Sequence, residues 1–295
     1  MKKLDLPVYF YGFTAMLFWG MSFIWTTILL RYYQPVTIIL LRLVISSSFL
    51  FLIIWLFHKK EQIHKKDIGL LVLSALFNPF LYFLCENNGL KFITPAVTSV
   101  IIATIPVFSP VVAYVYFRER LSFQNLAGIL ICFSGIVIML INKQYSLNVD
   151  PKGIYFLSGA VLSALIYSVL LKKLTCRYSA LTIISWQNLI GILFFLPLFL
   201  IFNFDHFIKV RMNVEIISSF LLLAILASSV SYIFYTITLK SIGISKANIY
   251  TNLIPVFTAV FSYFFISELF TAAKIAGIFM VITGVFISEK KFGKN

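Results

Sequence analysis

Charged side chains are scarce in this sequence. Only 12% of the 295 residues are Asp, Glu, Lys or Arg, and just 10 of them are acidic. A soluble domain carries roughly 25% charged residues, so half of the side chains that would keep a folded surface in water are missing. Hydrophobic residues make up 61% of the chain, more than soluble cores of this length could cover. The composition excludes an ordinary soluble protein and predicts a polytopic membrane protein.

Cysteine and histidine are also rare. The cysteines Cys85, Cys132 and Cys176 are odd in number and scattered, which gives neither a disulfide framework nor a metal-binding spacing. We interpret them as small core residues. The three histidines lie in loops and the acidic residues are dispersed. The sequence therefore predicts no metal and no cofactor, and it speaks against a membrane-embedded enzyme.

Two further motifs are missing. No glycine-rich loop followed by Lys and Ser or Thr occurs, so we do not expect this chain to hydrolyse ATP. The net charge of +14 comes from Lys and Arg in short loops between apolar runs, where such residues orient helices. Because no basic stripe or aromatic-basic module accompanies them, we expect no nucleic-acid partner.

What the sequence does contain is continuous apolar runs of about 20 residues, the length of a membrane helix, without the short alternating segments of a barrel. Lys2 and Lys3 precede the first run and no small-residue cleavage site follows it, so we expect an uncleaved span. We expect ten spans at approximately 8–30, 36–57, 68–87, 93–117, 123–142, 153–172, 180–202, 214–239, 245–267 and 272–289.

Orientation follows from the positive charges. With the N-terminus on side one, the loops of that side hold sixteen Lys and Arg residues and those of the other side hold seven, while Arg42 lies inside a span. Positively charged loops stay in the cytoplasm. We therefore expect a multi-pass protein of the cell (cytoplasmic) membrane with both termini in the cytoplasm.

The stretch from 90 to 138 occurs twice. Adding 149 to each number reproduces 15 of its 49 residues without a gap. The matches that an apolar composition cannot supply are Pro106/Pro255, Glu119/Glu268, Gly128/Gly277 and Gly135/Gly284. The chain is thus predicted to be an internal duplication, with one five-helix repeat at 8–142 and a second at 153–289.

Each repeat has five spans, an odd number, so the second repeat must be inverted. The loop charges agree, because Arg118 and Arg120 flank Glu119 on the cytoplasmic side, whereas Glu268 on the other side has no basic neighbour. The predicted fold class is an all-α integral membrane protein of ten transmembrane helices in two inverted five-helix repeats. Many secondary transporters have this architecture, with a binding site near mid-membrane between the halves.

The sequence resembles the EamA-type members of the drug/metabolite transporter (DMT) superfamily from about 10 to 288. The resemblance implies a central cavity lined chiefly by spans one, three, four, six, eight and nine. It also implies export or uptake of small polar metabolites such as amino acids, without specifying the substrate. The features that carry it are Trp19-Gly20, Arg42, and the series Pro106, Glu119, Gly128 and Gly135 with its second copy.

Pro106 and Pro255 each lie in mid-span, where a proline removes one backbone hydrogen bond and allows a kink. We interpret both as gating or structural residues. Small or polar residues precede them on the same helical face: Ser99 in span four, and Asn248 and Asn252 in span nine. Small residues also serve helix packing. Two amides one turn apart in lipid need partners, however, so we favour a cavity for the asparagines.

Two charged residues fall within or near the ends of spans. Glu86 ends span three, above Asn78 and Tyr82, and is either an interfacial or capping carboxylate or a cavity carboxylate that binds a substrate amine or takes up a coupling proton. Arg42 could snorkel to the interface. Since the resemblance places an arginine here in members with different substrates, we favour a structural or gating role for Arg42 over direct recognition.

The other candidates for substrate binding are polar or aromatic residues near helix centres: Trp19, Ser22, Tyr167, Ser231, Tyr232 and Tyr235. In a chain with 17% aromatic residues a given ring more often packs in the core or faces lipid. Trp19 and Tyr167 stand out because they align as repeat partners. The span-eight residues stand out because they form one polar stripe.

The recurrent Glu119 and Glu268 are helix-end residues on opposite membrane faces, which we interpret as caps or as partners of nearby backbone amides. The predicted function is a secondary transporter that exports a small polar or amphipathic, amino-acid-like metabolite by alternating access. Its expected partners are the small-molecule substrate, the lipid bilayer and a coupling proton, and both a monomer and a homodimer fit the sequence. The alternatives are a membrane-embedded enzyme and a passive channel or scaffold, although a channel normally has a ring of like groups.

Overall fold

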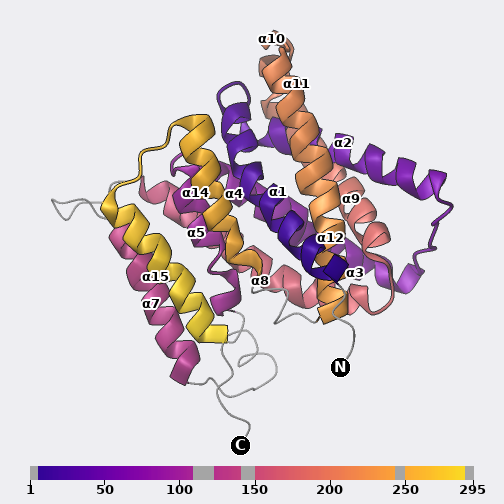
Figure 1. Cartoon of the computed structure of the whole chain (residues 1–295). Coiled ribbons are helices and arrows are strands. Elements are labelled where there is room, and N and C mark those ends of the chain that lie inside the picture. The colour runs from indigo at the N-terminus through magenta and orange to yellow at the C-terminus, as the bar shows by residue number, and fades with distance from the viewer. Residues whose placement is uncertain (1–5, 109–122, 141–149, 243–249, 290–295) are drawn as a thin grey trace, which may run out of the picture.

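The computed structural model of the chain describes residues 6–108, 123–140, 150–242 and 250–289. All regular structure in these ranges is helical and none of it is β-strand (Figure 1), which confirms the predicted all-α class for them. The elements are α1 (Leu6–Leu30), α2 (Pro35–Leu56), η1 (Lys65–Asp67), α3 (Ile68–Ala75), η2 (Leu76–Leu81), α4 (Tyr82–Leu90), α5 (Pro95–Ile102), α7 (Phe123–Leu140), α8 (Pro151–Thr175), α9 (Ala180–Phe202), α10 (Phe204–Lys209), α11 (Val214–Leu221), η3 (Leu222–Val230), α12 (Ser231–Ile242), α14 (Leu253–Ile266) and α15 (Ala272–Glu289).

Several helical stretches are long and apolar enough to cross a membrane. Within the described ranges there are six: Pro7–Leu30, Pro35–Leu56, Lys65–Leu90, Pro151–Thr175, Ala180–Phe202 and Val214–Thr238. Four shorter apolar helices accompany them: Pro95–Phe108, Leu126–Leu140, Leu253–Ile266 and Ala272–Ile287. This is the architecture of a multi-pass membrane protein.

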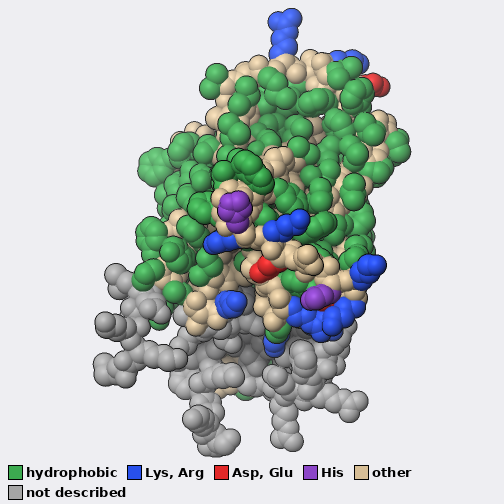
Figure 2. All heavy atoms as spheres, turned by 90° about the vertical axis from the view of Figure 1, so that its right-hand side faces the viewer, with side chains coloured by type: hydrophobic (Ala, Val, Ile, Leu, Met, Phe, Trp, Pro, Cys, Tyr) green, Lys and Arg blue, Asp and Glu red, His purple; other side chains and the backbone are tan. Residues whose placement is uncertain are grey.

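The surface agrees with a membrane location. Figure 2 shows hydrophobic side chains over most of the upper part of one face, with basic and histidine side chains gathered lower down. In Figure 1 the start of α1 and the ends of α8 and α15 lie toward the bottom, and we call this end the N-terminal face. The other end, where α4 and α14 finish and α5 begins, is the opposite face.

Helix starts follow from local sequence. Pro35 begins α2 at the first helical position, where its missing N–H costs nothing because that group has no helical partner. Helix α8 begins with Pro151 after Asp150, whose carboxylate accepts the amide of Lys152 at 2.9 Å. The hydroxyl of Ser179 caps α9 in the same way by accepting the amide of Thr182.

The helices pack in reciprocal pairs. Helix α1 lies against α12 and α14, and α8 lies against α4 and α5. Helix α2 packs on α9, and α7 on α15, so these contacts join elements of the predicted first repeat to elements of the predicted second one. Figure 1 shows α7 and α15 side by side at one edge of the molecule.

The crossing of α7 and α15 has the geometry of a two-fold contact. A Cβ at Gly135 would lie 2.9 Å from the carbonyl oxygen of Gly277, and a Cβ at Gly284 would lie 2.8 Å from that of Gly128. Between them the thiol of Cys132 donates to the carbonyl of Val281, its own counterpart 149 residues later, at 3.3 Å. Early residues of α7 therefore meet late residues of α15 and the reverse, so the two helices run antiparallel.

Polar contacts fasten corresponding connections at the two faces. At the N-terminal face Asp67 pairs with Arg177 and accepts the hydroxyl of Tyr178 at 2.8 Å, which joins the α2–α3 connection to the α8–α9 connection. At the opposite face the hydroxyl of Tyr32 donates to Glu215 at 2.7 Å, which joins the α1–α2 connection to α11. These contacts hold the bundle at both ends of the long helices.

We predict that Gly277→Val destabilises the protein, because a Cβ at Gly277 would overlap Met139 and lie 2.6 Å from the carbonyl oxygen of Gly135. Overpacking costs about 1–3 kcal/mol, so the midpoint of thermal unfolding in detergent should fall by several degrees. Gly69→Ala is the control, since a Cβ there meets nothing within 4 Å and Ala favours a helix by about 1 kcal/mol over Gly. Equal losses in both variants would contradict the prediction.

Candidate functional site

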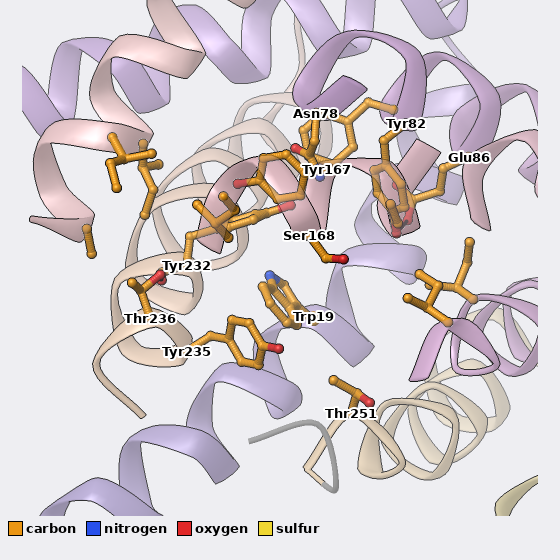
Figure 3. Close-up of a pocket in the computed structure, with 18 of the residues that line it drawn as sticks. Trp19, Asn78, Tyr82, Glu86, Tyr167, Ser168, Tyr232, Tyr235, Thr236 and Thr251 are labelled. Carbon is orange, nitrogen blue, oxygen red and sulfur yellow. Dashed lines mark hydrogen bonds between the residues drawn. The ribbon is translucent and has the colours of Figure 1, made fainter. Parts of the chain in front are cut away.

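A cavity of about 650 Å³ lies inside the bundle, within the usual size range for small-molecule sites. Its walls come from α1, α2, η2, α4, α5, α8, α9, α12 and α14 and the turns next to them. The polar and aromatic residues among them surround one space in Figure 3. The charged, polar and aromatic lining residues are Trp19, Ser22, Phe23, Arg42, Asn78, Tyr82, Phe83, Glu86, Tyr167, Ser168, Lys172, Lys173, Thr175, Tyr232, Tyr235, Thr236 and Thr251.

The cavity extends from the middle of the bundle to the N-terminal face. Glu86 and Arg42 line its inner end, and Lys172, Lys173 and Cys176 at the finish of α8 line its other end. The last three side chains are exposed. A solute on the N-terminal face therefore meets a basic entrance.

Toward the opposite face α4 and α8 close together. A Cβ at Gly89 would lie 2.6 Å from Leu157, and one at Gly153 would lie 2.5 Å from Ile93. Glycine is needed at both positions because the helices approach too closely for a side chain. This close packing lies between Glu86, at the inner end of the cavity, and that face.

Arg42 is a buried cation in the cavity wall. Its side chain is held by η3 and α4, since Nε donates to the hydroxyl of Ser228 and the guanidinium lies 4.0 Å from the centre of the Phe83 ring. The residue is 3% exposed. An uncompensated buried charge is costly, and the hydroxyl dipole and the ring face each offset part of that cost.

Glu86 is the anion of the same cavity and is 8% exposed. The hydroxyl of Tyr82, one helical turn earlier, donates to its Oε1 at 2.8 Å. Among the described residues, no ion pair joins Glu86 to Arg42. The cavity thus holds two opposite charges that are separated and that each have capacity for a further partner.

Aromatic rings form the wall between the charges and the entrance. Trp19 of α1 stands against Tyr232 and Tyr235 of α12, with both pairs of ring centres 5.1 Å apart. The hydroxyl of Tyr167 on α8 donates to Gln187 at 3.1 Å. These rings are fixed by hydrogen bonds and by each other, so the wall is preorganised.

Two of the long spans that carry site residues, Lys65–Leu90 and Val214–Thr238, are irregular in the middle, with a kink at Asn78 inside η2 and a π-helical segment at η3. The segments η2 and η3 end at Leu81 and Val230, which are 149 residues apart. Each receives a side chain from a neighbouring helix, because the indole of Trp19 donates to the Ala227 carbonyl at 3.1 Å and the hydroxyl of Ser163 donates to the Phe77 carbonyl at 2.7 Å. Kinks and π-helical turns free backbone groups, and these donors satisfy two of them.

The helices that contain Pro106 and Pro255 are interrupted at matching places. A turn at Ala103 and Thr104 precedes Pro106, and a turn at Asn252, the counterpart of Ala103, precedes Pro255. Pro106 has no N–H, so the carbonyl of Ile102 loses its helical donor. Ile102, Ala103 and Pro106 all line the cavity.

The structure brings most of the predicted site residues together. The cavity wall contains Trp19, Ser22, Arg42, Asn78, Tyr82, Glu86, Pro106, Tyr167, Tyr232 and Tyr235. Ser99, Ser231, Asn252 and Pro255 are buried away from it, and Asn248 lies outside the described residues. The hydroxyls of Ser99 and Ser231 donate to carbonyls of their own span, whereas both amide atoms of Asn252 are buried without a hydrogen-bond partner.

Sequence reasoning missed part of the wall. Ser168 and Thr236 line the cavity directly after the predicted Tyr167 and Tyr235 in the chain, and Thr251 lines it next to Asn252. These residues could have been found by including the neighbours of each predicted site residue on the same helix. The roles of Ser228 and Gln187 in holding cavity side chains have no comparable signal, because they depend on contacts between distant helices. No group of three or more His, Cys, Asp or Glu that could hold a metal ion occurs in the described part of the chain.

Comparisons with known proteins agree with this architecture. A solved structure described as "Crystal structure of protein" superposes with a TM-score of 0.68 at 16% identity, covering 95% of this chain and 97% of that one, which shows the shared fold. An "uncharacterized transporter" of Archaeoglobus fulgidus is 26% identical over 93% of this chain and 95% of its own length. The "uncharacterized transporter YetK" of Bacillus subtilis is 25% identical over 85% of this chain and 77% of its own length.

The relatives are named transporters, which favours transport over catalysis. The sequence profile of the EamA-like transporter family matches residues 6–141 and 151–289, and so accounts for nearly the whole chain in two successive copies. The protein therefore belongs to the EamA-like transporter family.

Proposed function

We propose that this protein is a secondary transporter of the cytoplasmic membrane that exports a small polar or amphipathic, amino-acid-like metabolite by alternating access. The observation that carries the proposal is the cavity, which holds one buried cation and one buried anion and extends to the N-terminal face, while α4 and α8 pack tightly toward the other side. A transport site must be reachable from one face at a time.

The proposal includes ten transmembrane helices in two inverted repeats. The six long and four shorter apolar helices overlap the ten predicted ranges, one to each, and four of the long helices extend beyond their ranges by one to three residues. The contact of Cys132 with its own counterpart Val281, and the exchange of glycine contacts around it, support a two-fold axis through the α7–α15 crossing. An axis of this kind in the membrane plane relates the halves of many transporters.

Separated opposite charges favour a zwitterionic cargo. A ligand ammonium beside Glu86 and a ligand carboxylate toward Arg42 would satisfy both charges at once, in a site where each is costly alone. The aromatic wall of Trp19, Tyr232 and Tyr235 would cover an apolar side chain. Ser228 and Phe83 hold the side chain of Arg42 in place, so Arg42 also has a structural role.

The direction follows from the orientation of the chain. The connections at the N-terminal face carry most of the positive charge, which places that face in the cytoplasm. The described conformation then presents the cavity to the cytoplasm, where an exporter loads its cargo. The basic entrance at Lys172 and Lys173 suits a solute that carries a carboxylate.

The zwitterion requirement can be tested in proteoliposomes. Counterflow of a labelled amino acid, chosen from a panel, should be inhibited by the unlabelled zwitterion. Its methyl ester and its N-acetyl derivative should each need a concentration more than about tenfold higher for the same inhibition. Each derivative leaves one buried charge without its partner, and a hydrogen bond to a charged group is worth about 1.5–3 kcal/mol. Equal inhibition by all three would contradict the assignment, and absence of counterflow for the whole panel would contradict amino-acid-like cargo.

Coupling to protons can be tested at Glu86. Glu86→Gln keeps the size and an acceptor for the hydroxyl of Tyr82 but cannot bind and release a proton. Transport should lose its response to an imposed pH gradient, while exchange at equal pH persists at higher substrate concentration. Glu215→Gln is the matched control, because Glu215 also accepts a tyrosine hydroxyl, that of Tyr32, outside the cavity. If transport by the Glu86 variant still responds to the pH gradient, Glu86 does not carry the coupling proton.

A further inference from the structure

We infer that Glu268 is a latch that keeps the cavity closed at the opposite face, an inference that depends on the alternating access proposed above. Glu268 lies at the corner between α14 and α15 and is 9% exposed. Its Oε2 accepts the backbone amide of Ala96 in the first turn of α5 at 3.4 Å, and its Oε1 accepts Nζ of Lys274 at 3.1 Å. One carboxylate thus joins a corner of the second repeat to a helix of the first.

The backbone of the corner positions this carboxylate. Ser267 ends α14 in the left-handed conformation with φ 56°, which is uncommon for a residue with a side chain. The turn lets the amide of Glu268 donate to the Ser262 carbonyl at 3.1 Å and brings the side chain toward α5. Lys274 also donates to the Leu269 carbonyl at 3.2 Å, so the corner holds its own cation next to the carboxylate.

The contact is charge-assisted and separable. A carboxylate at a helix N-terminus is attracted by the free amides of the first turn, and the partial burial of Glu268 strengthens that attraction. When the corner moves away, Lys274 can accompany Glu268 because both belong to the same corner, so the carboxylate is not left without a partner. Only the bond to α5 has to break.

Helix α5 connects this contact to the cavity. It runs from Pro95 beside Glu268 to Ile102 in the cavity wall, where the turn at Ala103 interrupts the span. Opening the cavity to the opposite face requires helices of the two repeats to separate at that face. Glu268 is the charged contact that resists this separation between α5 and the α14–α15 corner.

The sequence also singles out the residue. Glu268 is one of the few polar residues kept in both copies of the repeat, and its counterpart Glu119 lies outside the described residues. We had interpreted both glutamates as caps or partners of nearby amides. Glu268 does accept a backbone amide, but that of α5 in the other repeat instead of one in the span that follows it.

Labelling of a cysteine in the cavity tests the latch without any substrate. Ser168, which lines the cavity, is replaced by Cys in a chain whose Cys85, Cys132 and Cys176 have been changed to Ala. Intact cells are treated with a membrane-impermeant maleimide from outside. Glu268→Gln should raise the labelling rate roughly tenfold, because losing a charge-assisted hydrogen bond shifts the equilibrium by about that factor.

Two further variants make the result decisive. Asp150→Asn is the matched control, because the carboxylate of Asp150 also accepts a first-turn amide, that of Lys152, but within its own helix α8, and this variant should leave the labelling rate unchanged. Lys274→Met leaves the carboxylate without its own cation once the corner moves away from α5, so it should lower the labelling rate, and it tests the latch even if Glu268→Gln fails to fold. Unchanged labelling in both Glu268→Gln and Lys274→Met, or an increase in Asp150→Asn equal to that in Glu268→Gln, would overturn the latch, whereas failure of the counterflow assay alone would overturn only the cargo.

Discussion

A helix interrupted inside an apolar bundle must find new partners for the backbone groups that it frees, because neither lipid nor aliphatic side chains can supply them. Four interruptions occur in the described chain next to the cavity: the kinked segment η2, the π-helical segment η3, and the turns at Ala103 and Asn252. Trp19 and Ser163 donate to carbonyls of η3 and η2. The cavity lies next to these interruptions. Trp19, which donates to one of the freed carbonyls, is also part of the cavity wall.

The same constraint explains the polar layer behind the cavity. Asn188 donates to Ser46, which in turn bonds Ser229, while the amide of Gln187 donates to Ser74. Every contact in this layer joins two different spans, so it fixes the helices around the site as well as satisfying polar groups. Gln187 also accepts the hydroxyl of Tyr167, so this layer supports the cavity wall directly. Arg42 is the buried cation of the cavity, whereas Lys172 and Lys173 are exposed at its entrance.

Much of this could be predicted from the sequence because it depends on properties of short segments. Apolar length predicts the long apolar helices, and repeat spacing singles out Pro106, Glu268 and Gly277 as structural. Repeat alignment indicates Trp19 as a candidate, the polar stripe indicates Tyr232 and Tyr235, and all three line the cavity. Contacts between distant spans could not be predicted in this way.

The asparagine pair shows where such reasoning ends. Asn252 has the polarity and spacing of a cavity residue, yet it is buried away from the wall. Helical periodicity tells which residues share a face only while a helix is regular, and the turn at Asn252 interrupts the regular helix. Likewise nothing in the local sequence connects Glu268 with Ala96, 172 positions earlier.

The difference in helix length across the bundle has a consequence for the surrounding lipid. Helices α7 and α15 have 18 residues each and span about 27 Å, whereas α1 and α8 have 25 and span about 38 Å. A hydrocarbon core of about 30 Å suits the first pair and requires tilt of the second. Because α7 and α15 lie at one edge and pack chiefly on each other, the bilayer meets two different thicknesses around one molecule. The length of the lipid acyl chains therefore influences the tilt of α1 and α8, the helices that carry Trp19 and Tyr167.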